Sequence, residues 1–193
     1  MKELLERLED RFTVTESDVE RDNLAFITLP SKEVVQAATH LRDIEGFGHL
    51  VMISAVDYIE RGIFQLTYIL HNYDKHSDIG VRTEIDRRNP VMDSIHHLWA
   101  AARVYQQELR EMFGIDFPGS PRVDEPMILE GWDNIPPMRK DFDTKKYAEE
   151  TYFPREGRVT YDPARAMEEK NYPLEARVKK RIQKLLREGK DED

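Results

Sequence analysis

With 193 residues, the chain has the length of one ordinary domain, or of a domain of about 140 residues with a long appendage. Hydrophobic residues make up 39% of the chain and charged residues 35%, which indicates a thin domain with much surface or a subunit whose polar faces meet partners. The absence of cysteine excludes disulfides, thiolate zinc sites, cysteine nucleophiles and cysteine-bound iron–sulfur clusters held by this chain alone. The formal charge of −9 argues against general nucleic-acid binding.

The sequence also lacks the patterns of membrane insertion and export. No apolar run approaches the roughly 18 residues that a membrane-spanning helix needs, and the N-terminal segment does not resemble a signal peptide. We therefore expect a soluble, cytoplasmic chain. Its heavy use of lysine, arginine and glutamate is typical of proteins that work at high temperature.

The first half of the chain shows helical and strand patterns. Between residues 62 and 72 the apolar residues Phe64, Leu66 and Tyr68 recur at every second position, as in a strand with one buried face. The elements expected up to residue 86 are, in chain order, an amphipathic helix at 2–12, a strand at 23–29, a helix with Ser31 as its N-cap that ends near Gly46, and strands at 49–58, 62–72 and 79–85. This order predicts an α+β fold with a small, mainly antiparallel sheet packed with helices.

The second half changes from a helical pattern to irregular chain. Apolar spacing predicts a long helix at about 94–112, closed by Gly114, after which glycine and proline become dense. Such a long irregular stretch is usually functional or braced by another surface. The following residues stay extended and polar until a last helix at 174–188, which has one apolar stripe and an otherwise basic surface.

From these patterns we predict two parts: a compact α+β domain at 1–114, and an irregular, partner-wrapping extension at 115–193 with the terminal helix. The basic terminal helix is consistent with protein docking, with a solvated end or with contact to an anionic membrane surface.

Two groups of residues are candidates for chemistry. His96 and His97 are adjacent on the expected helix, so their side chains diverge and do not favour a shared metal ion. Glu108 and Glu111 share a helix face near its C-terminal end, where the helix dipole disfavours anions; a partner cation would explain them, although a solvated face is the simpler interpretation. Two alternatives therefore stay open: a stand-alone enzyme that uses these residues, and an adaptor that binds through the terminal helix.

Two separated blocks, VYQQELREMFGIDFPGSP at 104–121 and PPMRKDF at 136–142, resemble the signature of the 30 kDa (NuoC-type) subunit family of respiratory complex I, the NADH dehydrogenase of the respiratory chain. The blocks occur in the order and spacing of that family. The matching residues are Glu108, Glu111 in place of the family's Asp, Met112, Phe113, Gly114, Ile115, Phe117, Gly119, Pro121, Ile128, Leu129, Pro137, Arg139, Lys140, Asp141 and Phe142.

The chain departs from the usual respiratory pattern at Gln106, Gln107, Ser120, Ile135 and Pro136. It therefore looks more like the divergent members in complex-I-related membrane assemblies, namely energy-converting nickel–iron hydrogenases, formate hydrogenlyases and sulfur-reducing complexes of heat-loving archaea. A genuine 30 kDa subunit of a respiratory NADH:quinone oxidoreductase is the alternative.

The resemblance implies a scaffold subunit in the peripheral arm of an ion-translocating redox complex, on the cytoplasmic side of the membrane. Members of the family pack against the large, hydrogenase-like (D-type) subunit of such complexes, and lie near the small iron–sulfur (B-type) subunit. They bind no cofactor or metal themselves, since the iron–sulfur clusters, and in hydrogenases the nickel–iron centre, belong to partner subunits. The resemblance thus implies protein partners, indirect membrane association, no nucleic acid, and no catalytic, cofactor or metal residues in this chain.

The resemblance also suggests which residues face a partner. They are Glu108, Phe113, Gly114, Pro137, Arg139, Lys140, Asp141 and Phe142. We expect Arg139 and Asp141 to form charge-assisted contacts at the interface, because a guanidinium fork can hold a carboxylate or several carbonyls in a desolvated setting. Pro136 and Pro137 precede the charged triplet formed by Arg139, Lys140 and Asp141. These two prolines would keep the backbone of the triplet rigid.

Overall fold

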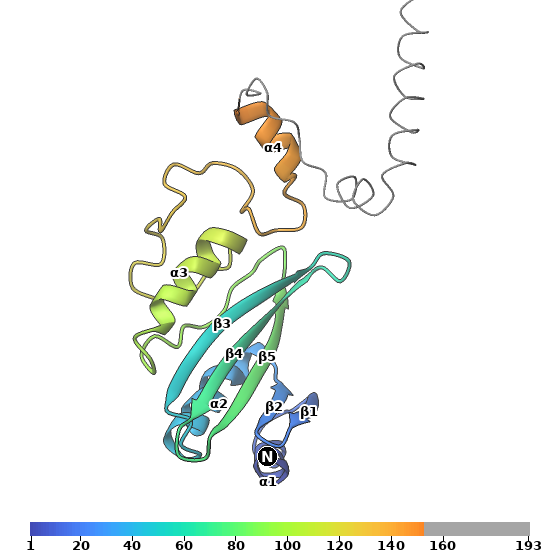
Figure 1. Ribbon diagram of the computed structural model, residues 1–193, viewed down its shortest axis with the longest axis vertical. Helices are drawn as coiled ribbons and strands as arrows, with labels where there is room; N and C mark the ends of the chain where they lie inside the picture. Colours follow the sequence, from blue (N-terminus) through green and yellow to red (C-terminus); the bar gives the residue numbers. More distant parts are fainter. Residues whose placement is uncertain (153–193) are drawn as a thin grey trace, which may run out of the picture. The chain divides into compact units, whose positions relative to one another are not determined.

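The computed structural model describes residues 1–152, of which residues 1–144 form one compact unit. The elements of this unit, shown in Figure 1, are α1 (Lys2–Glu9), β1 (Glu16–Arg21), β2 (Leu24–Thr28), the 3-10 turn η1 (Ser31–Glu33), α2 (Val34–Asp43), β3 (His49–Tyr58), β4 (Ile63–Asn72), β5 (Ser77–Asp86) and α3 (Ala102–Phe113). A further helix, α4 (Thr144–Thr151), lies almost entirely in a second unit that begins at Lys145, and is described by itself. None of the helices within residues 1–152 has the length and the apolar character that a membrane span requires.

A five-stranded sheet in the order β1-β2-β5-β4-β3 forms the frame of the first unit. Neighbouring strands run antiparallel, except that β2 and β5 are parallel. The exception arises because the chain leaves β2, forms α2 and the β3–β4 hairpin, and only then returns as β5 to pair with β2. The expected α+β fold with a mainly antiparallel sheet is confirmed.

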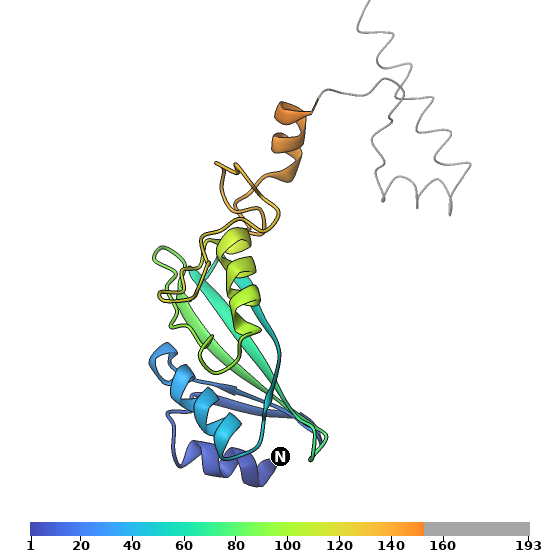
Figure 2. The same cartoon turned by 90° about the vertical axis from the view of Figure 1, so that its left-hand side faces the viewer.

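One face of the sheet is buried in the core of this unit. Half-buried and buried residues alternate along all of β4, and the buried set consists of Phe64, Leu66, Tyr68, Leu70 and Asn72. The apolar members of this set share one core cluster with buried residues of α1, α2 and α3. Figure 2 shows the three helices alongside the strands. The removal of this apolar surface from water is the main favourable contribution to the stability of the unit.

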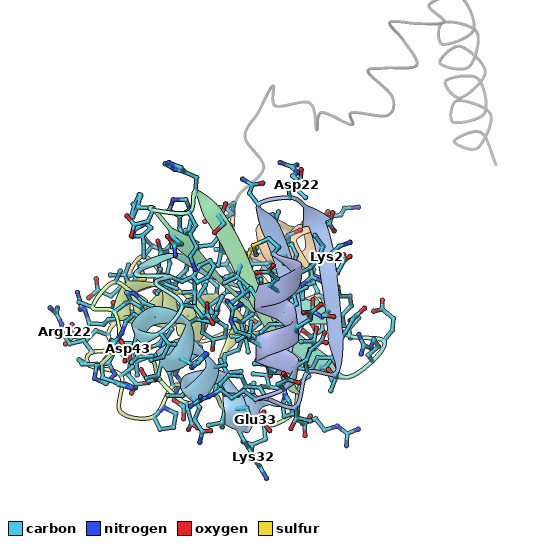
Figure 3. All side chains as sticks on the ribbon, turned by 90° about the horizontal axis from the view of Figure 1, so that it is seen from below. Lys2, Asp22, Lys32, Glu33, Asp43 and Arg122 are labelled. Atoms are coloured by element: carbon cyan, nitrogen blue, oxygen red, sulfur yellow. The ribbon has the colours of Figure 1, made fainter. Side chains whose placement is uncertain are left out.

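Many charged side chains lie on the outside of the unit, although Glu45 and Asp57 are buried. Figure 3 shows Lys2 on α1, Asp22 after β1 and Lys32 on η1 at the periphery, and all three residues are exposed. Every residue of the edge strand β1, which reads ESDVER, is exposed as well. An edge of this composition discourages pairing with another sheet.

The sequence analysis missed two elements. β1 lacks alternating apolar residues, so it has no period-two signal, and it forms because its backbone pairs with β2. The segment at 144–151 was expected to be extended but is the helix α4. Pairs at i and i+4, Lys145 with Glu149 at 4.0 Å and Lys146 with Glu150 at 3.9 Å, lie along this helix and are typical of exposed helices.

The long helix predicted at about 94–112 begins later in the structure, where α3 starts at Ala102. The oxygen of Ser94 accepts a hydrogen bond from the backbone N–H of His96 at 3.2 Å, and the backbone then turns through bonds such as Leu98 N to Ile95 O at 3.0 Å. A serine that binds its own neighbouring backbone in this way competes with helix formation. The predicted helix end at Gly114 is confirmed, since this glycine is the C-cap with φ of 74°.

The predicted N-cap at Ser31 is wrong. Ser31 opens the 3-10 turn η1 after Pro30, no side-chain cap bond is formed there, and the α-helix begins at Val34. The predicted terminal helix at 174–188 lies outside the described residues. The predicted division of the chain at residue 114, with an extension that wraps a partner, stays a prediction.

Candidate partner-docking site

The charged segment 139–141 lies against the sheet, where it meets two residues that are distant in the sequence. Asp57, near the end of β3, has a side chain that is only 1% exposed. Arg87, directly after β5, donates to this carboxylate from Nε to Oδ1 at 2.8 Å and from Nη2 to Oδ2 at 3.0 Å. The same Nη2 donates to Oδ1 of Asp141 at 2.6 Å. Arg87 therefore joins a carboxylate of the sheet to one of the segment.

Two further hydrogen bonds hold the segment to the sheet. The backbone N–H of Lys140 donates to Oδ2 of Asp57 at 2.8 Å, and Nη2 of Arg139 donates to the backbone carbonyl of Arg87 at 2.9 Å. The guanidinium carbon of Arg139 also lies 5.2 Å from the centre of the Phe64 ring, which suits a cation–π contact. The charges of Arg139 and Asp141 thus have partners within the chain itself.

The charge of this contact set is fixed at neutral pH. Burial raises the pKa of the Asp57 carboxyl, but the hydrogen bonds from Arg87 and from the N–H of Lys140 outweigh burial, so that its pKa lies below the ordinary value of 3.8. The hydrogen bond from Arg87 likewise lowers the pKa of Asp141. The hydrogen bond to Asp57 raises the pKa of Arg87. All three side chains are therefore ionised, and the set holds together by charge-assisted hydrogen bonds.

A second contact set holds the preceding part of the irregular segment. The carboxylate of Glu111, in the last turns of α3, accepts three consecutive backbone N–H groups: Met127 at 3.0 Å, Ile128 at 3.2 Å and Leu129 at 2.8 Å, all to Oε1. One helix turn earlier, Nε2 of Gln107 donates to the carbonyl of Glu125 at 2.6 Å. Glu111 thus fixes a turn of irregular chain on the side of α3.

The eight residues expected to face a partner differ in their exposure. Glu108, Lys140 and Asp141 are exposed; Gly114, Pro137, Arg139 and Phe142 are half-buried; and Phe113 is buried, with its ring edge-on to Phe64 at 5.9 Å. The two motif blocks are joined directly, because the N–H of Met138 donates to the carbonyl of Met112 at 3.1 Å. A direct contact of these eight residues with a partner stays a prediction.

The residues of the alternative enzyme hypothesis, Glu108, Glu111, His96 and His97, are either exposed or engaged in hydrogen bonds within the chain. Glu111 is engaged by backbone N–H groups, and Glu108 is exposed. His96 is half-buried, with Nδ1 at 2.9 Å from Oγ of Ser94, whereas His97 is exposed. Across residues 1–152, no group of three or more histidine, aspartate or glutamate side chains is arranged to hold a metal ion.

The sequence analysis did not identify Asp57 or Arg87. A signal for Asp57 exists, because it continues the inward register of Ile53 and Ala55 on β3, and an acid at a buried strand position needs a cation or several donors. Arg87 offers no such signal, since it follows the last strand among other charged residues.

Comparisons with known proteins point to one family. Residues 27–148 match the family model described as the 30 kDa subunit of respiratory-chain NADH dehydrogenase. A curated relative, the C subunit of NADH-quinone oxidoreductase from Phenylobacterium zucineum, is 33% identical over 147 residues, which cover 76% of this chain and 69% of that protein.

Two solved structures resemble the fold. A chain of the membrane-bound sulfane sulfur reductase, an archaeal respiratory membrane complex, aligns with a TM-score of 0.73 and 26% identity, covering 83% of this chain and 95% of that one. A trypsin-resistant fragment of Nqo5 aligns with a TM-score of 0.54 and 22% identity, covering 62% of this chain and 96% of the fragment, which shows a shared fold.

Proposed function

We propose, since this chain belongs to the family of the 30 kDa subunit of respiratory-chain NADH dehydrogenase, that it serves as a non-catalytic scaffold subunit of a complex-I-related, membrane-associated redox complex. The observation that carries the proposal is the likeness to a chain of the archaeal sulfane sulfur reductase, which extends over nearly all of that chain. The lack of cysteine in the sequence supports it, because the iron–sulfur clusters of such a complex then take their ligands from other subunits.

In this proposal the chain lies in the peripheral arm on the cytoplasmic side and docks on the large, hydrogenase-like subunit, near the small iron–sulfur subunit. The docking site is formed by the eight motif residues and the irregular segment that carries most of them, and residues 115–193 wrap the large subunit. Two fixed contact sets, around Asp57 and around Glu111, support this assignment, because a segment held in one conformation loses little entropy when it docks.

A second candidate is the corresponding subunit of a respiratory NADH-quinone oxidoreductase. The curated relative from Phenylobacterium zucineum is named as a subunit of that enzyme. The two candidates share the scaffold role and differ in the large subunit that they contact.

Purification through an affinity tag on the full chain, from detergent-solubilised membranes of its source, tests the proposal. We expect mass spectrometry to find a large, hydrogenase-like subunit and a small iron–sulfur subunit in amounts comparable to the tagged chain. Paired Cys-x-x-Cys motifs in the large subunit would identify a hydrogenase. Their absence would identify one of the other complex-I-related assemblies. A chain that purifies alone and turns over a small molecule would contradict the scaffold role and favour an enzyme based on Glu108 and Glu111 or on His96 and His97.

A further inference from the structure

Four large apolar side chains are exposed on the irregular segment between α3 and α4. The exposed fractions are 42% for Met127, 74% for Ile128, 41% for Ile135 and 57% for Met138. Exposed apolar residues that are scattered singly are ordinary, whereas a set gathered on one part of the surface marks an interaction site.

The backbone that carries these side chains is fixed at two places near one end of α3. Glu111 holds the N–H groups of Met127 and Ile128, and the carbonyl of Met112, the next residue of the helix, holds the N–H of Met138. The side chain of Pro136 lies 3.3 Å from the position that a Cβ on Gly114 would take, so the segment returns to the same helix end. The apolar side chains therefore project from a preorganised backbone.

Several charges of the same region are matched internally, whereas Glu130 and Asp133, which lie between the apolar residues in the sequence, are exposed. Arg110 pairs with Asp124 at 3.0 Å, Arg122 donates to Glu125 at 2.6 Å, and Arg87 pairs with Asp141 at 2.6 Å. The Glu111 carboxylate faces three backbone donors. These ion pairs are satisfied within the chain, whereas the four apolar side chains stay exposed.

We infer that Met127, Ile128, Ile135 and Met138, here called the apolar anchors, insert into an apolar surface of the large subunit and contribute most of the docking affinity. Arg139, Asp141 and Glu111 act as positioning residues that hold the anchors in place from within the chain. The inference rests on the proposed function, because it names the part of the docking site that makes the contact. It differs from the expectation drawn from the sequence, in which charged residues make the contact.

Methionine oxidation tests the inference in the assembled complex. Met127 and Met52 have the same exposed fraction, 42%, but Met52 lies on β3 rather than on the segment. Brief treatment with hydrogen peroxide, followed by peptide mass spectrometry, should oxidise both residues at similar rates in the free chain. In the tagged complex we expect Met127 and Met138 to be protected about tenfold or more, and Met52 to react as before.

A matched pair of substitutions gives an independent test. Ile128→Asn replaces an anchor that is 74% exposed, and Ile44→Asn replaces an isoleucine at the end of α2 that is 71% exposed. Both variants should keep the melting temperature of the free chain, because neither side chain is packed in the core. Ile128→Asn should weaken binding of the purified large subunit by about tenfold or more, as expected for a central apolar contact, and Ile44→Asn should leave it unchanged.

The outcomes separate this inference from the proposed function. Equal oxidation of Met127 in the free chain and in a complex that contains the large subunit overturns the inference and leaves the scaffold role intact. Equal affinities of the Ile128→Asn and Ile44→Asn variants for the large subunit likewise overturn the inference and leave the scaffold role intact. A tagged chain that never carries the large subunit overturns both together.

Discussion

The carboxylate of Asp57 accepts three hydrogen bonds, two from Arg87 and one from the backbone N–H of Lys140. Its side chain is almost fully buried, and that of Arg87 is 15% exposed. Removal of one partner from such a pair leaves the other charge buried without compensation, which costs far more than the pair itself contributes. The attachment of segment 139–141 to the sheet therefore depends on a residue outside both motif blocks.

Asp57→Asn should lower the free energy of unfolding of the free chain by about 3 kcal/mol at pH 7. Because the folded-state pKa of Asp57 lies below its unfolded value, the stabilisation from its charge is complete above about pH 4 and is lost as the pH falls through the folded pKa. The gap between wild type and variant should therefore narrow below about pH 4 in urea denaturation. Asp124→Asn, at a side chain that is 75% exposed, is the control and should change little. A gap of the same size at all pH values would contradict this role.

Glu111→Gln should loosen the turn at residues 127–129. An amide accepts hydrogen bonds more weakly than a carboxylate does, so we expect hydrogen exchange at the amides of Met127, Ile128 and Leu129 to accelerate by about tenfold. Glu108→Gln, at an exposed position on the same helix, is the matched control and should leave these amides unchanged. Unaltered exchange in the Glu111 variant would mean that the turn is held by other contacts.

At the scale of residues, the sequence named candidates for the site but did not reveal what their side chains contact. Arg139 and Asp141 stand in the motif, whereas their contact Arg87 is 52 and 54 residues away. Asp57 and Arg87 are separated by 30 residues, so no local pattern connects them. Such contacts arise from the register of β3 and β5 across β4, which only the folded sheet defines.

At the scale of elements, agreement between sequence and structure follows the strength of the periodic signal. The strand predicted at 62–72 corresponds to β4 nearly residue for residue, because its alternate side chains are buried. β1 has no buried residue and was missed. The prediction of a helix at 94–101 was wrong for a different reason. Ile95 is fully buried, but it lies at a turn and not on a helix. Its place in the apolar pattern therefore indicates burial and does not indicate a helical backbone.

The parallel junction between β2 and β5 depends on a glycine. Phe26 of β2 lies over Gly80 of β5, and a Cβ at Gly80 would come within 2.2 Å of the Phe26 ring. The guanidinium carbon of Arg82 lies 3.9 Å from the centre of that ring. A side chain at position 80 would therefore displace Phe26 and break its contact with Arg82.

Gly80→Ala should destabilise the free chain by about 1–3 kcal/mol, as overpacking usually does. Thermal denaturation should show the loss, and the Gly80→Ala change should cost little in a Phe26→Ala background, where the ring is absent. Gly48→Ala is the control, because nothing lies within 4 Å of the Cβ position at Gly48. A Gly80→Ala variant as stable as the wild type would show that the Phe26 ring can move aside without cost.

At the scale of the whole molecule, the order of the expected elements predicted the fold class, and the sequence motifs predicted the family. The physical patterns alone indicated an α+β domain and no catalytic centre, but they did not indicate which surface meets a partner. The structure assigns the charges of Arg139 and Asp141 to contacts within the chain and leaves apolar side chains exposed on the same segment. The function we propose is therefore that of a folded support that presents a fixed apolar surface to a neighbouring subunit.

Cross-linking of the purified complex with an amine-reactive reagent tests that central claim most directly. Lys140 lies on the charged segment and Lys32 on η1, and both residues are exposed. We predict that mass spectrometry will find links from Lys140 to the large subunit and none from Lys32. Links to the large subunit from Lys32, with none from Lys140, would contradict the docking site and the account built on it.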